Sequence, residues 1–347
     1  MARHNDQLPP GLRTAARMTF SLGEKRAVEA VLAEFRPDVV HLHNVYPSFG
    51  PAVHLAAASR GVPLAMTVHN FRLRCPNGFM FTEGAPCRRC ENGNYMNAVM
   101  HKCFESRTQA AGYASSLWAH RFALRLENKV SLFITPSSFL KSRMIQWGFP
   151  RDQLRVIRNF TSAPAASSRP GTFGMYLGRL SSEKGIEVLL HALRAADDPP
   201  FRFVGDGPVL KSLQLLAGRL ELTNTQFVGR LAHQDAAAML AGARFLVFAS
   251  QWDENAPLAA LEAMAAGRPL LVTDKGGLPE LVANGEGLIC RAGDARDMGE
   301  KIAALVRDEE LIVAMAARGV ARVRAEFTPE THLEQLENAY RNILERS

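Results

Sequence analysis

The 347-residue chain lacks an uninterrupted apolar run long enough to cross a membrane. A membrane-spanning helix needs about 18 to 20 apolar residues, and the apolar stretch 240–249 is broken by Arg244. The N-terminus, MARHNDQLPPGLRTAARM, also lacks the apolar core of a secretory signal. We therefore expect a cytoplasmic protein whose five cysteines are reduced.

Blocks of consecutive basic residues and solenoid-length repeats are also missing. The 41 Lys and Arg residues exceed the 34 Asp and Glu residues, and the net charge of +7 favours acidic partners such as nucleotides or anionic lipid. Without basic blocks interleaved with aromatic residues, nucleic acid is not expected as a partner. The content of 47% hydrophobic and 22% charged residues is typical of globular proteins, and the length suits two domains.

Short apolar runs alternate with helical patterns along most of the chain, which predicts an α/β fold with parallel sheets. In the first half such runs predict strands at 39–43, 64–69, 132–135 and 154–157. In the second half they predict strands at 173–177, 201–204, 225–228, 245–248, 269–273 and 287–290.

A stretch rich in Ser, Ala, Pro and Gly, Thr161–Gly171, separates the two sets and is typical of an interdomain linker. We therefore predict an N-terminal domain at 1–163 and a C-terminal domain at 172–327. Residues 328–347 are expected to form a helix that packs back on the N-terminal domain, with Thr328 as N-cap and Pro329 at the first position. The apolar face of this helix is predicted to contain Leu333, Leu336, Tyr340 and Ile343.

The segment 174–185, GMYLGRLSSEKG, is a predicted strand followed by a loop and a helix. Arg179 and Lys184 flank this loop and suit a diphosphate, although two solvated loop cations would give the same pattern. The next strand ends in VGDGP, where Gly205 and Gly207 allow a backbone to approach a ligand closely, as they would in an ordinary turn.

The segment 252–267, WDENAPLAALEAMAAG, predicts a helix with Pro257 at its first position. The N–H groups of Leu258 and Ala259 would then point out of its N-terminus, where they suit a phosphate. Glu254 precedes the helix and Glu262 lies two turns inside it, although a pair of glutamates at this spacing also arises by chance.

Taken in order, GRLSSEKG, VGDGP, FVGR and ENAPLAALEAMAAGRPLLVTDKGGLPE resemble the donor domain of family 4 glycosyltransferases. The resemblance covers residues 173–290 and extends more weakly back to residue 37. It implies the GT-B fold, in which two Rossmann-like domains with parallel sheets face each other across a cleft. It also implies a retaining glycosyltransferase that uses a nucleotide-sugar donor.

By this resemblance, Arg179 and Lys184 would hold the donor diphosphate and Glu262 would bond the ribose. Glu254 would face the transferred sugar and act in catalysis. The residues that follow it, Asn255-Ala256-Pro257, differ from the Phe-Gly that is commoner in the family. The remaining donor contacts implied are Gly205 and Gly207 at the nucleotide, and Ala256 and Leu258 at the helix N-terminus. Because cations and helix N–H groups can stabilise the leaving diphosphate, and because no Asp-x-Asp pair is present, we expect no catalytic metal.

Histidines occur at the ends of two predicted strands in the first half. His41 and His43 share one strand face, which suits either a metal or packed, hydrogen-bonded histidines. His69 ends the next predicted strand, where the resemblance implies a cleft residue that contacts donor or acceptor and acts in catalysis. A core histidine is the alternative.

Four of the five cysteines, Cys75, Cys87, Cys90 and Cys103, lie close together in the sequence. In a reducing compartment their spacing favours a structural zinc site over disulfides, with unligated thiols as the alternative. We predict that the insert 75–103, ordered by this zinc, shapes the acceptor opening.

The sequence thus predicts transfer of a sugar to a glycan or lipid-linked acceptor in polysaccharide biosynthesis, with possible peripheral contact to the anionic inner face of a membrane. Residues 1–20 contain no strand-like run, so the first strand is expected to be missing and transfer to be slow. A non-catalytic or impaired nucleotide-sugar-binding protein is therefore an alternative, and sugar-nucleotide epimerisation is another.

Overall fold

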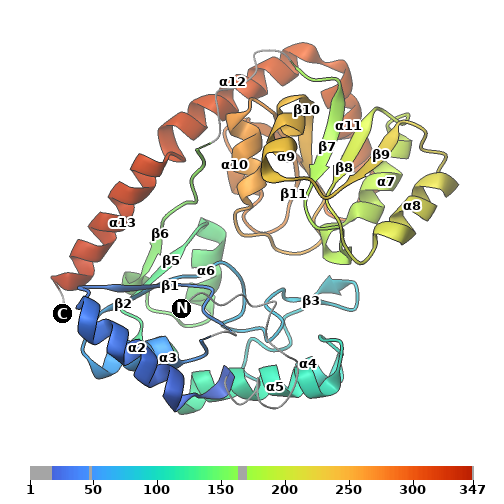
Figure 1. The fold of residues 1–347 in the computed structure, drawn as a ribbon. Helices are drawn as coiled ribbons and strands as arrows, with labels where there is room; N and C mark the ends of the chain where they lie inside the picture. The colour runs from blue at the N-terminus through green and yellow to red at the C-terminus, as the bar shows by residue number, and fades with distance from the viewer. Residues whose placement is uncertain (1–17, 47–48, 163–169, 346–347) are drawn as a thin grey trace. The chain divides into compact units, whose positions relative to one another are not determined.

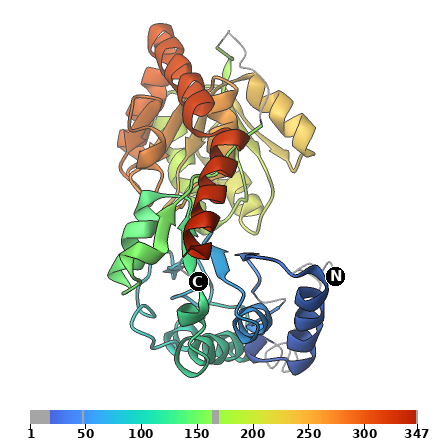
Figure 2. The same cartoon turned by 90° about the vertical axis from the view of Figure 1, so that its left-hand side faces the viewer.

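The computed structural model describes residues 18–46, 49–162 and 170–345. Residues 1–157 together with 334–347 form one compact unit, called here the N-terminal unit, and residues 158–333 form the C-terminal unit. Each unit is an α/β layer structure built on a parallel sheet (Figures 1 and 2). Most of the predicted linker and most of segment 1–20 lie outside the described residues.

The sheet of the N-terminal unit has four parallel strands in the order β1-β2-β5-β6. Their bounds are β1 Val40–His43, β2 Leu64–Thr67, β5 Leu132–Thr135 and β6 Leu154–Val156. All four predicted strands are therefore present, although β2 ends at Thr67 rather than at His69. β5 is buried along its whole length, as expected for a central strand of a parallel sheet.

Helices of the N-terminal unit begin at serine caps in three cases. The side chains of Ser21, Ser106 and Ser137 accept hydrogen bonds from backbone N–H groups in the first turns of α2, α5 and α6. The helices are α2 Leu22–Phe35, α3 Ala52–Ser59, α4 Asn97–Met100, α5 Arg107–Trp118 and α6 Ser138–Gln146. A π-helical turn, Ala119–Ala123, and a 3-10 turn, Leu126–Lys129, follow α5.

The last helix, α13 Pro329–Leu344, packs its C-terminal half on the N-terminal sheet. Ala339 and Ile343 are buried in one cluster with Ala65, Leu132 and Ile134 of the sheet. Leu336 and Tyr340 also pack against this cluster, whereas Leu333 is 54% exposed. The predicted apolar face is therefore wrong at Leu333, because the sheet contacts begin one turn later in the helix.

The sheet of the C-terminal unit has six parallel strands in the order β12-β11-β10-β7-β8-β9. Their bounds are β7 Phe173–Leu177, β8 Phe201–Val204, β9 Thr225–Gly229, β10 Ala243–Phe248, β11 Leu270–Thr273 and β12 Gly287–Cys290. All six predicted strands are present, and β10 begins two residues earlier than predicted, at Ala243.

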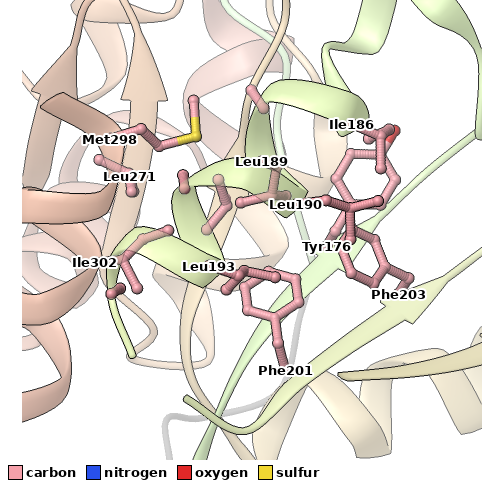
Figure 3. Close-up of a cluster of buried hydrophobic side chains, with 14 of the residues drawn as sticks. Tyr176, Ile186, Leu189, Leu190, Leu193, Phe201, Phe203, Leu271, Met298 and Ile302 are labelled. Carbon is pink, nitrogen blue, oxygen red and sulfur yellow. The ribbon is translucent and has the colours of Figure 1, made fainter. Parts of the chain in front are cut away.

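One face of this sheet carries a large hydrophobic core (Figure 3). Leu189, Leu190 and Leu193 of α7 lie in this core, and Leu190 and Leu193 lie near the aromatic side chains Phe203 and Phe201 of β8. The spacing of these leucines gives α7 the single apolar stripe of a helix that covers a sheet. The helices of the unit are α7 Ile186–Ala195, α8 Leu210–Arg219, α9 His233–Ala241, α10 Leu258–Ala265, α11 Ala295–Arg307 and α12 Glu309–Glu326.

Among the described residues, none of the helices combines the length and the apolar character that a bilayer crossing requires.

Candidate functional site

The loop after β7 presents a cation at the carboxyl end of the C-terminal sheet. Arg179 is exposed, and its guanidinium forms no ion pair with any residue that the structure describes. The backbone of Arg179 is fixed, since the hydroxyl of Tyr176 donates a 2.7 Å hydrogen bond to its carbonyl oxygen. The loop is thus held in place while the guanidinium stays available to a ligand.

The glycines after β8 bring a second loop against the first one. A Cβ added to Gly205 would lie 1.8 Å from the carbonyl oxygen of Gly178, and one added to Gly207 would lie 2.1 Å from that of Leu180. Gly205 also has a φ of 140°, which larger residues rarely adopt. Only glycine therefore allows these two loops to pack this closely.

Glu254 follows β10, is 6% exposed and contacts Lys184, the second cation after β7. One carboxylate oxygen accepts hydrogen bonds from Lys184 Nζ at 2.5 Å and from Ser250 Oγ at 2.7 Å. The ammonium of Lys184 also lies 5.1 Å from the centre of the Trp252 ring. This ion pair is not apparent from the sequence, because 70 residues separate its partners.

The loop after β11 fixes the backbone of Glu254 from the other side. The N–H of Gly277 donates to the Glu254 carbonyl oxygen at 2.6 Å, and a Cβ on Gly276 would lie 2.1 Å from the same oxygen. Sequence analysis missed Ser250, Gly276 and Gly277, although the Lys-Gly-Gly turn after β11 was a visible signal.

The N-terminus of α10 is open in this structure. Pro257 has an extended conformation and is the N-cap rather than the first helical residue, and no described side chain caps the helix. Leu258 and Ala259 therefore begin the helix with their N–H groups unpaired in the first turn. The Ala256 carbonyl oxygen accepts a 2.9 Å hydrogen bond from Asn159 Nδ2, which anchors the approach to the helix. Glu262 is the fifth residue of α10, so it lies about one turn inside rather than two.

These features gather at one edge because β10, β7 and β8 are neighbours in the sheet and run in parallel. Their carboxyl ends carry the helix N-terminus, the cationic loop and the glycine loop respectively. Ligands of parallel sheets bind at this edge. A free guanidinium and open N–H groups at the same edge of a sheet are donors that suit a diphosphate.

In the N-terminal unit, histidines lie side by side after β1 and β2. His43 Nδ1 and His69 Nε2 are 2.9 Å apart, and burial together with His43 lowers the pKa of His69. His41 instead bonds Thr67 Oγ1 at 2.8 Å and the Tyr340 hydroxyl at 2.5 Å. His41 thus links α13 to the sheet through hydrogen bonds. For His41 the structure therefore agrees with the alternative of a hydrogen-bonded histidine rather than a metal ligand.

His69 also lines a cavity of about 90 Å³ that sequence analysis did not find. The wall includes Tyr46, His54, Arg72 and Tyr113, which come from separate segments of the N-terminal unit. His54 is 6% exposed, and burial lowers its pKa to about 4, with a smaller contribution from His120.

We expect this buried histidine to make stability depend on pH. The folded pKa of His54 lies below the ordinary value of 6.5, so its contribution is present above pH 6.5 and is lost as the pH falls toward 4. The free energy of unfolding should drop by about 2 kcal/mol between pH 7 and pH 5 through this group. Urea unfolding of His54→Gln should show a flatter pH dependence than wild type, and exposed His233→Gln should not. Parallel curves for His54→Gln and wild type would contradict this.

The prediction of a structural zinc site is not supported. Cys75, Cys87, Cys90 and Cys103 line one small cavity of about 10 Å³, but no group of three or more described side chains is arranged to hold a metal ion. The Cys75 thiol donates instead to Asn77 Oδ1 at 2.9 Å, and that of Cys103 lies 3.6 Å from Thr82 Oγ1. Burial, with smaller contributions from the neighbouring thiols of Cys75, Cys103 and Cys87, raises the pKa of Cys90 to about 12.

The cysteine segment is ordered in another way. It contains a small hairpin, β3 Phe81–Thr82 paired with β4 Ala85–Pro86, which sequence analysis also missed. Asn77 supports its start by donating to the Phe81 carbonyl oxygen at 3.2 Å. In this segment the hairpin and the Asn77 side chain make contacts that help to order the chain, a role that the sequence-based prediction gives to zinc.

Comparisons with known proteins match both units of the chain. Residues 2–159 match the model of the glycosyl transferase 4-like domain, and residues 164–322 match that of glycosyl transferases group 1. The chain is 25% identical over 330 residues to a putative teichuronic acid biosynthesis glycosyltransferase, TuaC, of Bacillus subtilis, covering 93% of this chain and 76% of that protein. It is 30% identical over 148 residues to an uncharacterized glycosyltransferase of Methanocaldococcus jannaschii, covering 42% of each chain.

Solved structures share the fold. The Anabaena protein HepE, in complex with UDP, superposes with a TM-score of 0.69 at 20% identity, over 92% of this chain and 82% of that one. Sucrose-phosphate synthase of Thermosynechococcus elongatus superposes with a TM-score of 0.68 at 19% identity, over 93% and 78%. Together with the two family matches, which account for both sheets, they show that the chain belongs to the family 4 glycosyltransferases of GT-B fold.

Proposed function

We propose that this protein transfers a sugar from a nucleotide-sugar donor to a glycan or lipid-linked acceptor, with retention of the anomeric configuration. Family membership supports a transferase, and the related HepE structure contains UDP. The observation that carries the donor assignment is the exposed guanidinium of Arg179, which is unpaired among the described residues and follows β7, the sheet neighbour of the strand β10 that precedes the open N-terminus of α10.

The proposed task of this edge is to stabilise the departing nucleoside diphosphate. Arg179 would bond the phosphates through two N–H groups, while the N–H groups of Leu258 and Ala259 would add neutral donors. Fixed donors aimed at developing charge are among the strongest contributions to catalysis. The donor site proposed here also includes Gly205, Gly207 and the carbonyl-anchored Ala256.

The ion pair of Lys184 and Glu254 supports linked roles for these two side chains. Donor phosphates would draw Lys184 from Glu254, because two phosphates carry more negative charge than one carboxylate. Ser250 would then keep Glu254 oriented, through the 2.7 Å hydrogen bond, toward positive charge that develops on the transferred sugar. In this proposal Glu254 is the catalytic carboxylate and Lys184 switches between it and the donor.

Glu262 is proposed to accept hydrogen bonds from the ribose hydroxyls. Its side chain is partly exposed on α10, and a carboxylate is an acceptor that suits paired hydroxyl groups. We expect Glu262→Ala to raise the donor dissociation constant about 3- to 10-fold with little change in kcat, which steady-state kinetics with varied donor would measure. A fall in kcat at unchanged donor affinity would assign Glu262 to the reaction instead.

His69 is proposed to contact the substrate as a neutral imidazole. Burial and the neighbouring His43 hold its pKa below the ordinary range, so the ring is uncharged at neutral pH and can exchange hydrogen bonds with sugar hydroxyls. Its position in the wall of the N-terminal cavity links it to the acceptor side.

The experiment that tests the proposed function is product formation with a panel of UDP-, GDP- and ADP-sugars. Release of nucleoside diphosphate from one donor, lost in Glu254→Gln, would support a transferase. Tight binding of a donor without release, in the presence of candidate glycan and lipid-linked acceptors, would instead support the binding-protein alternative.

A further inference from the structure

The cavity of the N-terminal unit has the size and position of a binding site for a small group. It lies where β1 and β2 end, and its volume of about 90 Å³ is room for several water-sized groups, each of which needs about 10 to 15 Å³. His69, proposed above to contact substrate, is part of the wall. A group bound here would therefore lie near His69, at the carboxyl ends of β1 and β2.

Arg72 is a charged group of this wall that no carboxylate neutralises among the described residues. Its guanidinium lies 5.4 Å from the ring centre of Tyr46 and 5.7 Å from that of Tyr113. Its Nη1 atom is buried and has no hydrogen-bond partner in the part of the chain that the structure describes. The aromatic rings hold the guanidinium in place, but they provide no hydrogen-bond acceptor for the N–H groups of Nη1.

The other charged residues of the cavity wall are already engaged. Glu127 pairs with Arg74, through Arg74 Nη2 and Glu127 Oε2 at 3.0 Å and a second contact of the same two groups. Arg121 donates to the Glu91 carbonyl oxygen at 3.2 Å and to the Tyr95 hydroxyl at 3.1 Å. Neither Arg72 nor Arg121 is paired with a carboxylate among the described residues, and Arg72 is the one of the two with a buried N–H group that lacks a partner.

A second polar atom of the wall is also unsatisfied. His54 is 94% buried, as its exposed fraction is 6%, and its Nδ1 has no hydrogen-bond partner among the described residues. Buried polar groups without partners cost free energy, and in native proteins such groups call for an explanation. Here Arg72 Nη1 and His54 Nδ1 belong to the same cavity.

We infer that this cavity binds a phosphate or carboxylate carried by the acceptor substrate, held by the guanidinium fork of Arg72. The shared chemistry is that of an anion with oxygens spaced for bidentate bonding, which matches arginine better than a neutral sugar hydroxyl does. The faces of Tyr46 and Tyr113 would pack against the apolar part of the same acceptor. The inference rests on the proposed transferase function and adds to it the charge of the acceptor.

The test is calorimetric titration of the full chain with inorganic phosphate, glucuronate and uncharged glucose. We expect phosphate or glucuronate to bind and glucose not to bind. Arg72→Gln should weaken anion binding about 10- to 100-fold, as expected for loss of a charged hydrogen bond, and Arg72→Lys should weaken it less. Arg107→Gln removes an exposed arginine from the start of α5, outside the cavity wall, and should change nothing.

A local readout distinguishes the cavity from the donor loop. In NMR spectra of histidine-labelled protein, the ring signals of His54 should shift on adding the anion to wild type and should not shift in Arg72→Gln. If anion binding is lost in Arg179→Ala and kept in Arg72→Gln, the anion belongs to the donor loop and the inference is wrong, while the proposed donor site stands. Unmoved His54 signals at anion saturation would also overturn the inference.

An experiment with lipid vesicles distinguishes the two sources of the anion, a lipid phosphate and an acidic glycan. Flotation with phosphatidylcholine vesicles containing phosphatidylinositol is compared with phosphatidylcholine alone. Loss of phosphatidylinositol-dependent flotation in Arg72→Gln, with Arg72→Lys intermediate, supports a lipid phosphate. Arg72-dependent binding of glucuronate without such flotation supports an acidic glycan. If Arg72→Gln changes neither binding, although its thermal unfolding matches wild type, the inference is refuted.

Discussion

Glu254→Gln is expected to lower kcat about 100- to 1000-fold while leaving donor affinity unchanged or slightly improved. The glutamine keeps the size of the side chain and a hydrogen-bond acceptor for Ser250, but it removes the charge proposed to stabilise the transferred sugar. The same change frees Lys184 from its ion pair, so Lys184 becomes more available to the donor phosphates. Steady-state kinetics and calorimetry with the same nucleotide sugar measure the two quantities separately.

Glu187→Gln is the matched control for this variant. Glu187 is an exposed carboxylate in the first turn of α7, three residues after Lys184 in the sequence, and its loss should alter neither quantity. If Glu254→Gln instead weakens donor binding at unchanged kcat, Glu254 contributes to binding of the donor and not to the reaction, and the proposed catalytic role is wrong.

Arg179→Ala is expected to weaken binding of a nucleoside diphosphate about 10- to 100-fold. Loss of a hydrogen bond to a charged group costs about 1.5 to 3 kcal/mol, and each 1.4 kcal/mol changes the affinity tenfold. Because the guanidinium forms no ion pair among the described residues, its removal leaves no buried charge behind and should hardly change the free energy of unfolding. Calorimetry with the diphosphate and a urea titration measure these two effects.

Arg194→Ala, at an exposed position near the end of α7, is the control for a general loss of positive charge. Both variants change the net charge equally, so equal weakening would indicate long-range attraction rather than a contact. Unchanged affinity in Arg179→Ala for the whole panel of diphosphates would remove the diphosphate assignment.

The strands were predictable from the sequence because buried parallel strands are short apolar runs that loops interrupt. All ten runs became strands, and most errors at their ends concern one or two residues. The hairpin β3–β4 was missed since two-residue strands such as Phe81–Thr82 carry no detectable pattern. Leu333 was misplaced because periodicity alone does not show where along α13 the contact with the sheet begins.

The candidate donor site could be predicted where its residues lie in one ordered motif. Arg179 and the start of α10 were found in this way, whereas the contact of Lys184 with Glu254 depends on the neighbouring positions of β7 and β10 in the sheet. The zinc prediction is not supported, since cysteine spacing does not determine where the thiols point. The N-terminal cavity was not visible since Tyr46, His54, Arg72 and Tyr113 meet only after folding.

The measurement that tests the central claim most directly is proton NMR of the protein incubated with nucleotide sugars, including UDP-glucose and GDP-mannose, together with candidate glycan and lipid-linked acceptors. The spectra follow the anomeric proton of the donor and that of the newly formed glycosidic bond to the acceptor. A retaining transferase predicts release of nucleoside diphosphate together with a product that has the anomeric configuration of the donor, and loss of both signals in Glu254→Gln. A product of inverted configuration, or release that is unchanged in Glu254→Gln, would contradict the account.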